Sequence, residues 1–169
     1  RSYPYPPRLT PIVAKLRSEI ALTPGSQFRG RVATFTGQGI QRPIDWFDLH
    51  ALDRELLKHF GNDHRAVGLW HYDIPTLFEY SQFTTPPFYL FTKTFLSRAD
   101  DRQIRNVMVL RRIDPRALRV FGVRFFITDV QVDFDARLRV SLDAEGGGLF
   151  LYELAGVNLG DFSPTHTIV

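Results

Sequence analysis

Apolar residues recur at helical spacing in two segments of the first third of the chain. The first stripe follows Thr10-Pro11, a pair typical of a helix N-cap and first turn, and it predicts a helix over about residues 11 to 22. The second stripe follows Asp45, which can cap a helix, and ends at Gly61, which can stop one. The stripes consist of Ile12, Val13, Leu16 and Ile20 in the first helix and of Trp46, Leu49, Leu52, Leu56 and Phe60 in the second.

Two shorter segments on either side of the second helix have the pattern of strands. Residues 31 to 36 alternate in character and are followed by glycines. Residues 66 to 72, AVGLWHY, form a mainly apolar run that we interpret as a second strand. With the helix between them, these strands predict an early β-α-β unit, which favours parallel pairing through a right-handed crossover.

The middle of the chain is predicted to be mostly helical. Asp73 and Pro75 are typical of a helix start, and Pro86-Pro87 must interrupt that helix. A helical stripe restarts after the prolines, and two more helices are predicted beyond it. The stripe consists of Phe88, Phe91 and Phe95, and the later helix starts are Asp100 and Asp114-Pro115.

The last third of the chain changes to strand patterns. Runs of apolar or alternating residues are separated by turns, of which Gly146-Gly147-Gly148 is the clearest. We therefore predict an α/β domain with an α+β tendency, in which a mixed sheet has an early β-α-β unit, a helical middle and a C-terminal antiparallel β-meander. Residues 1 to 8, rich in proline, are predicted to be an extended lead-in or linker, and residues 9 to 169 a single domain. The predicted late strands are residues 123 to 130, 137 to 143, 149 to 154 and 165 to 169.

Composition narrows the classes of function. The 21 basic and 18 acidic residues give a net charge of +3, which is too small to imply a nucleic-acid partner. The arginines between Arg102 and Arg119 are interpreted as a solvated helix face, and the alternative is a patch for phosphate or lipid headgroups. Without cysteine, disulfides, thiolate catalysis and zinc–thiolate sites are excluded. No apolar run approaches the ~18 residues that a membrane-spanning helix needs. Because the chain begins at Arg1 and not at Met, we expect it to have been processed or excised from a longer protein.

The turn TGQGIQR, residues 36 to 42, is the first candidate for ligand binding. Glycines between a strand and a helix let backbone N–H groups approach a phosphate, but the third glycine of the dinucleotide fingerprint is missing here. Asp45 also stands at the helix entrance, so we interpret the segment as a plain turn. Its place at a strand end leaves Gln38 and Arg42 as candidate contacts for a polar ligand.

The segment from residue 61 to residue 88 is the second candidate. Its Asp63, His64, His71 and Asp73 are suitable ligand types for a metal but lack a defined ligand spacing, so no metal or cofactor is predicted. His71 and Asp73 would share a face of the predicted strand, where they could act as an acid–base pair. The alternative for Asp73 is a helix cap. For Glu79, which aromatic neighbours could desolvate, the alternative to an acid–base role is pairing with an arginine.

Aromatic residues are dense between Trp70 and Phe95. Core packing explains most of them at this spacing, but aromatic rings also offer flat apolar faces on which a sugar can stack. The candidate glycan-binding residues are those where aromatic faces meet hydrogen-bonding groups at predicted strand ends. They are Trp70, His71, Asp73, Tyr80 and Gln38.

Two stretches together resemble a known family. ALRVFGVRFFITDV, followed by a hairpin ending in GLFLYEL, and then NLGDFSPTHTIV, are similar to the extracytoplasmic C-terminal region of bacterial polytopic membrane proteins related to GT-C-type glycosyltransferases, the YfhO-like group. GND at residues 61 to 63, with GLWHYDIPTLFEYS after it, resembles the loop and helix that lie over the sheet in those proteins. The positions that match the late pattern are Gly122, Val123, Phe125, Ile127, Asp129, Tyr152 and Glu153.

The resemblance implies a soluble extracytoplasmic domain that is anchored through a membrane region outside this chain. The family's catalytic carboxylates lie in loops between membrane helices, so none is carried over to a residue here. The implied role is non-catalytic: recognition of a glycan or lipid-linked sugar, or orientation of the membrane part. Two alternatives stay open, a free-standing small enzyme that uses His71 with Asp73, and a structural or protein-interaction module.

Overall fold

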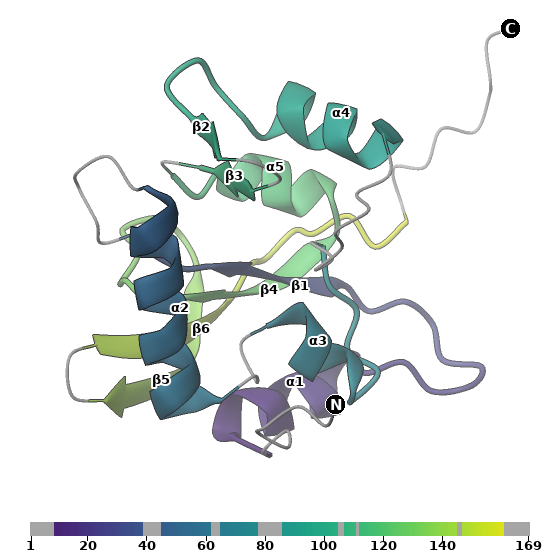
Figure 1. Cartoon of the computed structure of the whole chain (residues 1–169). Coiled ribbons are helices and arrows are strands. Elements are labelled where there is room, and N and C mark those ends of the chain that lie inside the picture. The colour runs from purple at the N-terminus through teal and green to yellow at the C-terminus, as the bar shows by residue number, and fades with distance from the viewer. Residues whose placement is uncertain are drawn as a thin grey trace, which may run out of the picture.

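A four-stranded mixed sheet forms the centre of the computed structural model (Figure 1). The strands lie in the order β1 (Arg31–Phe35), β4 (Val123–Thr128), β6 (Gly147–Glu153) and β5 (Arg137–Ala144). Strands β1 and β4 run parallel, whereas β6 runs antiparallel to both β4 and β5. The predicted mixed sheet, parallel early and antiparallel at the end, is therefore confirmed. The structure describes residues 9–38, 45–61, 65–77, 86–104, 107–110, 112–144 and 147–160.

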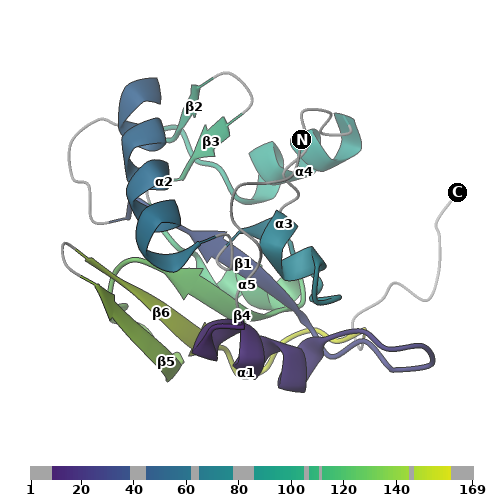
Figure 2. The ribbon, with the colours of Figure 1, turned by 60° about the horizontal axis from the view of Figure 1, so that its bottom comes forward.

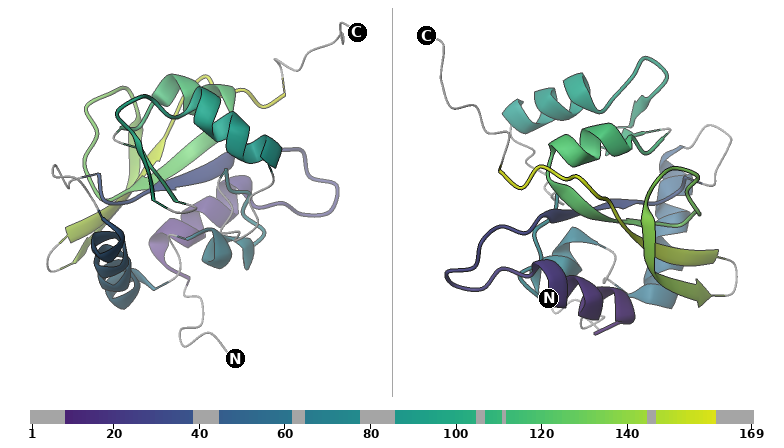
Figure 3. Two further views of the ribbon diagram at one scale, coloured as in Figure 1. Left: turned by 45° about the horizontal axis from the view of Figure 1, so that its top comes forward. Right: turned by 180° about the vertical axis from the view of Figure 1, so that it is seen from behind.

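Helices cover both faces of this sheet, as Figures 2 and 3 show. On one face, α1 (Pro11–Ile20), α2 (Trp46–Phe60) and α3 (Ala66–Trp70) enclose a core that includes Phe125 and Ile127 of β4. On the other face, α5 (Pro115–Val120) contributes Leu118 to a second core, and α4 (Pro86–Phe95) lies beyond α5. A small hairpin of β2 (Arg102–Ile104) and β3 (Val107–Val109) flanks this second layer.

Local capping signals account for the helices that were predicted correctly. The Thr10 hydroxyl accepts a hydrogen bond from the backbone N–H of Val13, and Asp45 and Asp48 form a reciprocal capping box at the start of α2. Asp114 caps α5 by accepting from the N–H groups of Arg116 and Ala117. Each cap satisfies backbone donors that the first helical turn leaves free.

The strand predicted over residues 66 to 72 is wrong, because residues 66 to 70 form the short helix α3. Leu69 of α3 is fully buried, and its carbonyl accepts from the N–H of Ile74, which turns the chain back into the same core. A short apolar run has too little periodicity to distinguish a strand from one helical turn. The parallel partner of β1 is consequently β4, and the early β-α-β unit is not formed by residues 66 to 72.

Two predicted helix starts are also wrong. After Asp73 the chain is extended, and the carbonyl of Pro75 accepts from Val32 N–H while Leu77 N–H donates to Val32 O, so this segment pairs with β1 instead of coiling. Asp100 lies in a turn that leads into strand β2. Of the described arginines in the basic stretch, Arg102 lies in β2 and Arg116 and Arg119 lie in α5, so these do not form one helix face.

Other predictions meet the structure only in part. Helix α4 begins at Pro86, as expected after a break at the two prolines, but its Phe95 is exposed and does not continue an apolar core stripe. The predicted strand 165 to 169, the lead-in 1 to 8, and Arg105 and Arg111 lie outside the described residues. Among the residues that the structure describes, no helix is both long and apolar enough to cross a membrane.

Candidate functional site

The turn after β1 is closed by a carboxylate from the neighbouring strand. Asp129, which directly follows β4, accepts hydrogen bonds from the backbone N–H of Gly37 at 2.7 Å and of Gln38 at 3.2 Å. The side-chain amide of Gln38 donates to the carbonyl of Leu110 at 3.2 Å. The N–H groups of Gly37 and Gln38 are thus used within the protein, and the Gln38 side chain ties this part of the turn to the segment after β3. Arg42, the second candidate of this turn, lies outside the described residues.

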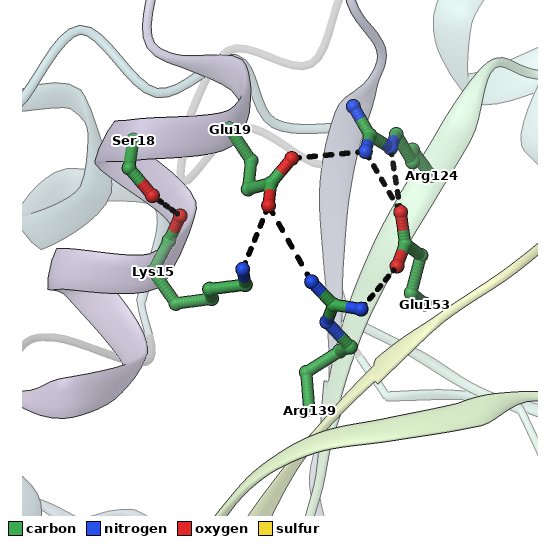
Figure 4. Close-up of polar contacts among 6 residues, drawn as sticks. All are labelled: Lys15, Ser18, Glu19, Arg124, Arg139 and Glu153. Atoms are coloured by element: carbon green, nitrogen blue, oxygen red, sulfur yellow. Dashed lines mark hydrogen bonds and ion pairs between the residues drawn. The ribbon is translucent and has the colours of Figure 1, made fainter.

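A charge cluster lies between α1 and the sheet and consists of Lys15, Glu19, Arg124, Arg139 and Glu153 (Figure 4). Arg124 lies 3.0 Å from Glu19 and 2.8 Å from Glu153. Arg139 closes the ring, at 3.4 Å from Glu19 and 3.3 Å from Glu153. Lys15 adds a contact of 2.7 Å to Glu19 from within α1.

The electrostatics of this charge cluster favour a structural role. The hydrogen bond from Lys15 lowers the pKa of Glu19, burial opposes that shift, and the positive charges of Lys15, Arg124 and Arg139 reinforce it. Both carboxylates accept from more than one cation, so the cluster holds α1 on strands β4, β5 and β6. The sequence contained one signal for it, because Arg124 interrupts an apolar strand and needs a partner there.

The α3 turn, which we define as residues 70 to 73 together with Thr76, contains three exposed candidate residues. Trp70 is 41% exposed, and its indole N–H donates to the hydroxyl of Thr76 at 2.8 Å. His71 and Asp73 follow in the same turn, and both are exposed. The indole is therefore open to solvent and is also held by a hydrogen bond.

His71 and Asp73 are close in sequence, but their side chains are not joined by a hydrogen bond in the described part of the chain. The His71 ring lies edge-on to Tyr72, with 5.0 Å between the ring centroids. Asp73 has a positive φ of 56° and continues into an extended segment, so the predicted helix-cap role is wrong. In the part of the chain that the structure describes, no hydrogen bond joins the imidazole to the carboxylate.

Several other sequence candidates are not placed. Asp63, His64, Glu79 and Tyr80 lie outside the described residues. Over the described ranges, no group of three or more histidine, aspartate and glutamate side chains is arranged to hold a metal ion. The absence of a cofactor remains a prediction.

Backbone hydrogen bonds fix the α3 turn to two elements of the first core. The N–H of Leu22, just after α1, donates to Asp73 O at 2.9 Å, and Val32 N–H of β1 donates to Pro75 O at 2.8 Å. The guanidinium of Arg17 lies 5.9 Å from the centre of the Tyr72 ring, in cation–π geometry. The turn is consequently joined to α1 on one side and to the sheet on the other.

The charge cluster predicts a specific dependence of stability on pH. Because the pKa of Glu19 is lowered in the folded protein, its contribution is complete above the unfolded value of about 4.5 and is lost as the pH falls through the lower folded pKa. Glu19→Gln should lower the free energy of unfolding at pH 7 by about 1–2 kcal/mol and flatten the acid limb of a urea-denaturation series.

The matched control is Glu55→Gln. Glu55 pairs with Lys58 at 3.9 Å and with His59 at 3.7 Å, and its side chain is 64% exposed. The substitution should therefore lower the free energy of unfolding by at most about 0.5 kcal/mol. If the two variants lose the same free energy of unfolding across the pH range, Glu19 does not stabilise the fold through the charge cluster.

Several residues that match the family pattern support turns or ion pairs in this fold. Gly122 has a positive φ of 71° between α5 and β4, Asp129 closes the turn after β1, and Glu153 belongs to the charge cluster. The Tyr152 hydroxyl accepts from the N–H of Val132 at the edge of the second core.

Comparison of the chain with protein-family models, curated proteins and solved structures found no match.

Proposed function

We propose that the chain is a non-catalytic, extracytoplasmic domain of a membrane protein related to GT-C-type glycosyltransferases, and that its α3 turn helps to recognise a glycan or lipid-linked sugar. The resemblance of the late strands motivates the first part of this proposal. The observation that carries the second part is the exposed indole of Trp70, which is oriented by Thr76.

An indole in this setting suits a sugar ring. One face of a pyranose is lined by C–H groups, and a large flat aromatic surface buries them with little loss of side-chain freedom. The hydrogen bond to Thr76 lowers the cost of binding further, since the ring is already ordered before a ligand arrives. Phe47 on α2 is 81% exposed but is not among the candidate residues, so it provides a control aromatic residue away from the α3 turn.

The polar residues beside Trp70 supply complementary chemistry. The exposed Asp73 carboxylate can accept hydrogen bonds from sugar hydroxyls, and the His71 imidazole can donate or accept. The backbone carbonyl of Asp73 is already used by Leu22, which holds the turn while leaving the Asp73 side chain available. Recognition requires no proton transfer between His71 and Asp73, in keeping with their uncoupled arrangement.

A glycan-array screen followed by calorimetric titration of the best glycan tests recognition. Trp70→Ala should weaken binding about tenfold or more, because truncation removes the stacking surface. Thr76→Val should weaken binding several-fold by releasing the indole, and Phe47→Ala should leave affinity unchanged. If no glycan binds, or if Trp70→Ala and Phe47→Ala behave alike, the domain is better explained as a structural or protein-interaction module.

Location can be tested separately, because the chain has no cysteine. A single Phe47→Cys substitution, placed in a cysteine-free version of the full-length protein in its native host, provides one exposed thiol. A membrane-impermeant maleimide should label it in intact cells to the same extent as after lysis. Labelling only after lysis would place the domain on the cytoplasmic side and refute this part of the proposal.

A further inference from the structure

Two arginines at the same end of the parallel strand pair have opposite environments. Arg124 in β4 contacts the carboxylates of Glu19 and Glu153, whereas the guanidinium of Arg31, at the start of β1, has no hydrogen-bond or ion-pair partner among the described residues. The Nε atom of Arg31 is also shielded from solvent. Arg31 is therefore a partly buried cation whose donors are unused within the described part of the chain.

An aromatic ring supports this guanidinium. The Arg31 guanidinium carbon lies 5.2 Å from the centre of the Phe28 ring. The ring in turn packs against Gly122, where the Cβ atom of any larger residue would lie only 3.4 Å from the edge of the Phe28 ring. The backbone N–H of Arg31 also donates to the carbonyl of Gly122 at 2.9 Å, so Gly122 contacts both Phe28 and Arg31. Stacking uses a face of the guanidinium and leaves its in-plane N–H groups available.

Partial burial makes this arrangement less favourable without an anion than with one. Burial lowers the pKa of Arg31, because partial removal of water from the guanidinium disfavours its charged form. A desolvated cation without a counter-charge or hydrogen bonds destabilises the folded state. The planar fork of a guanidinium matches two oxygens of a carboxylate or phosphate, which would meet both requirements at once.

We propose that Arg31, supported by Phe28, binds an oxyanion, a carboxylate or phosphate group of a ligand. This site is separate from the α3 turn and does not depend on glycan recognition there. Trp70→Ala should consequently leave oxyanion binding intact, and Arg31→Met should leave glycan stacking on Trp70 intact.

Thermal unfolding of the 169-residue chain in sodium phosphate, sodium acetate and sodium chloride at equal ionic strength tests the proposal. Phosphate or acetate should raise the Tm of the wild type saturably, by roughly 5–10 °C at a hundredfold excess over Kd, relative to chloride. Arg31→Met should remove this rise and, in chloride, have a Tm equal to or above that of the wild type, because it removes an unpaired charge. Arg54→Met, at an exposed position of α2, should respond like the wild type.

A second readout does not require a folded variant. In the wild type, phosphate or acetate should shift the Arg31 Nε–H signal in a nitrogen–proton NMR spectrum, and the Arg54 signal should stay in place. A response to phosphate alone identifies phosphate as the preferred group, and a response to acetate identifies a carboxylate. The proposal is overturned if neither anion changes the Arg31 signal or the Tm, or if Arg31→Met lowers the Tm in chloride while anions have no effect, since the guanidinium would then be paired within the chain.

Discussion

Strand β4 is packed on both faces, and this constraint determines where the other elements can lie. Phe125 and Ile127 enter the core beneath α1, α2 and α3, while Val123 and Phe126 enter the core beneath α5. A strand covered on both sides has almost no position for a polar residue, in agreement with its nearly continuous apolar sequence. The flanking strands β1 and β6 can then pair with it, one in parallel and one antiparallel.

The one charged residue of β4, Arg124, shapes the surroundings of the proposed sites. Arg124 lies between Val123 and Phe125, and its charge is compensated by carboxylates from α1 and β6. These ion pairs hold α1 on the sheet, and the segment after α1 then holds the α3 turn through Leu22. The surface around Trp70 is thus linked to the most deeply buried strand through a short series of contacts. Arg31, on the adjacent strand, has no such compensation among the described residues, which is the basis of the proposed oxyanion site.

Much of the fold followed from local sequence signals, because caps and periodicity act within a few residues. Thr10, Asp45 and Asp114 each cap a helix as predicted, and the mixed sheet and the three late strands that fall within the described residues were also correct. Residues 66 to 72 were misread because their apolar character reports burial without distinguishing one helical turn from a strand. The helix start predicted at Asp73 and Pro75 is wrong because backbone pairing with β1, a contact distant in sequence, outweighed the local helix signal.

The candidate sites were harder to predict from the sequence than the fold. Trp70 was named from its chemistry, but its support from Thr76 depends on how the turn folds back, and the lack of a described partner for Arg31 is visible only in three dimensions. The internal hydrogen bonds of Gln38, a predicted ligand contact, likewise depend on contacts distant in sequence.

Backbone hydrogen bonds join the α3 turn and the segment after it to the end of α1 and to β1, the strand beside β4, so we expect the turn to be rigid. Native-state hydrogen exchange measures this rigidity directly, since it reports the free energy of opening at each amide. The amides of Val32 and Leu77, which join β1 to the segment after the turn, should be nearly as protected as those of β4. Exchange of these two amides at the rate of an exposed loop, while β4 remains protected, would contradict that rigidity.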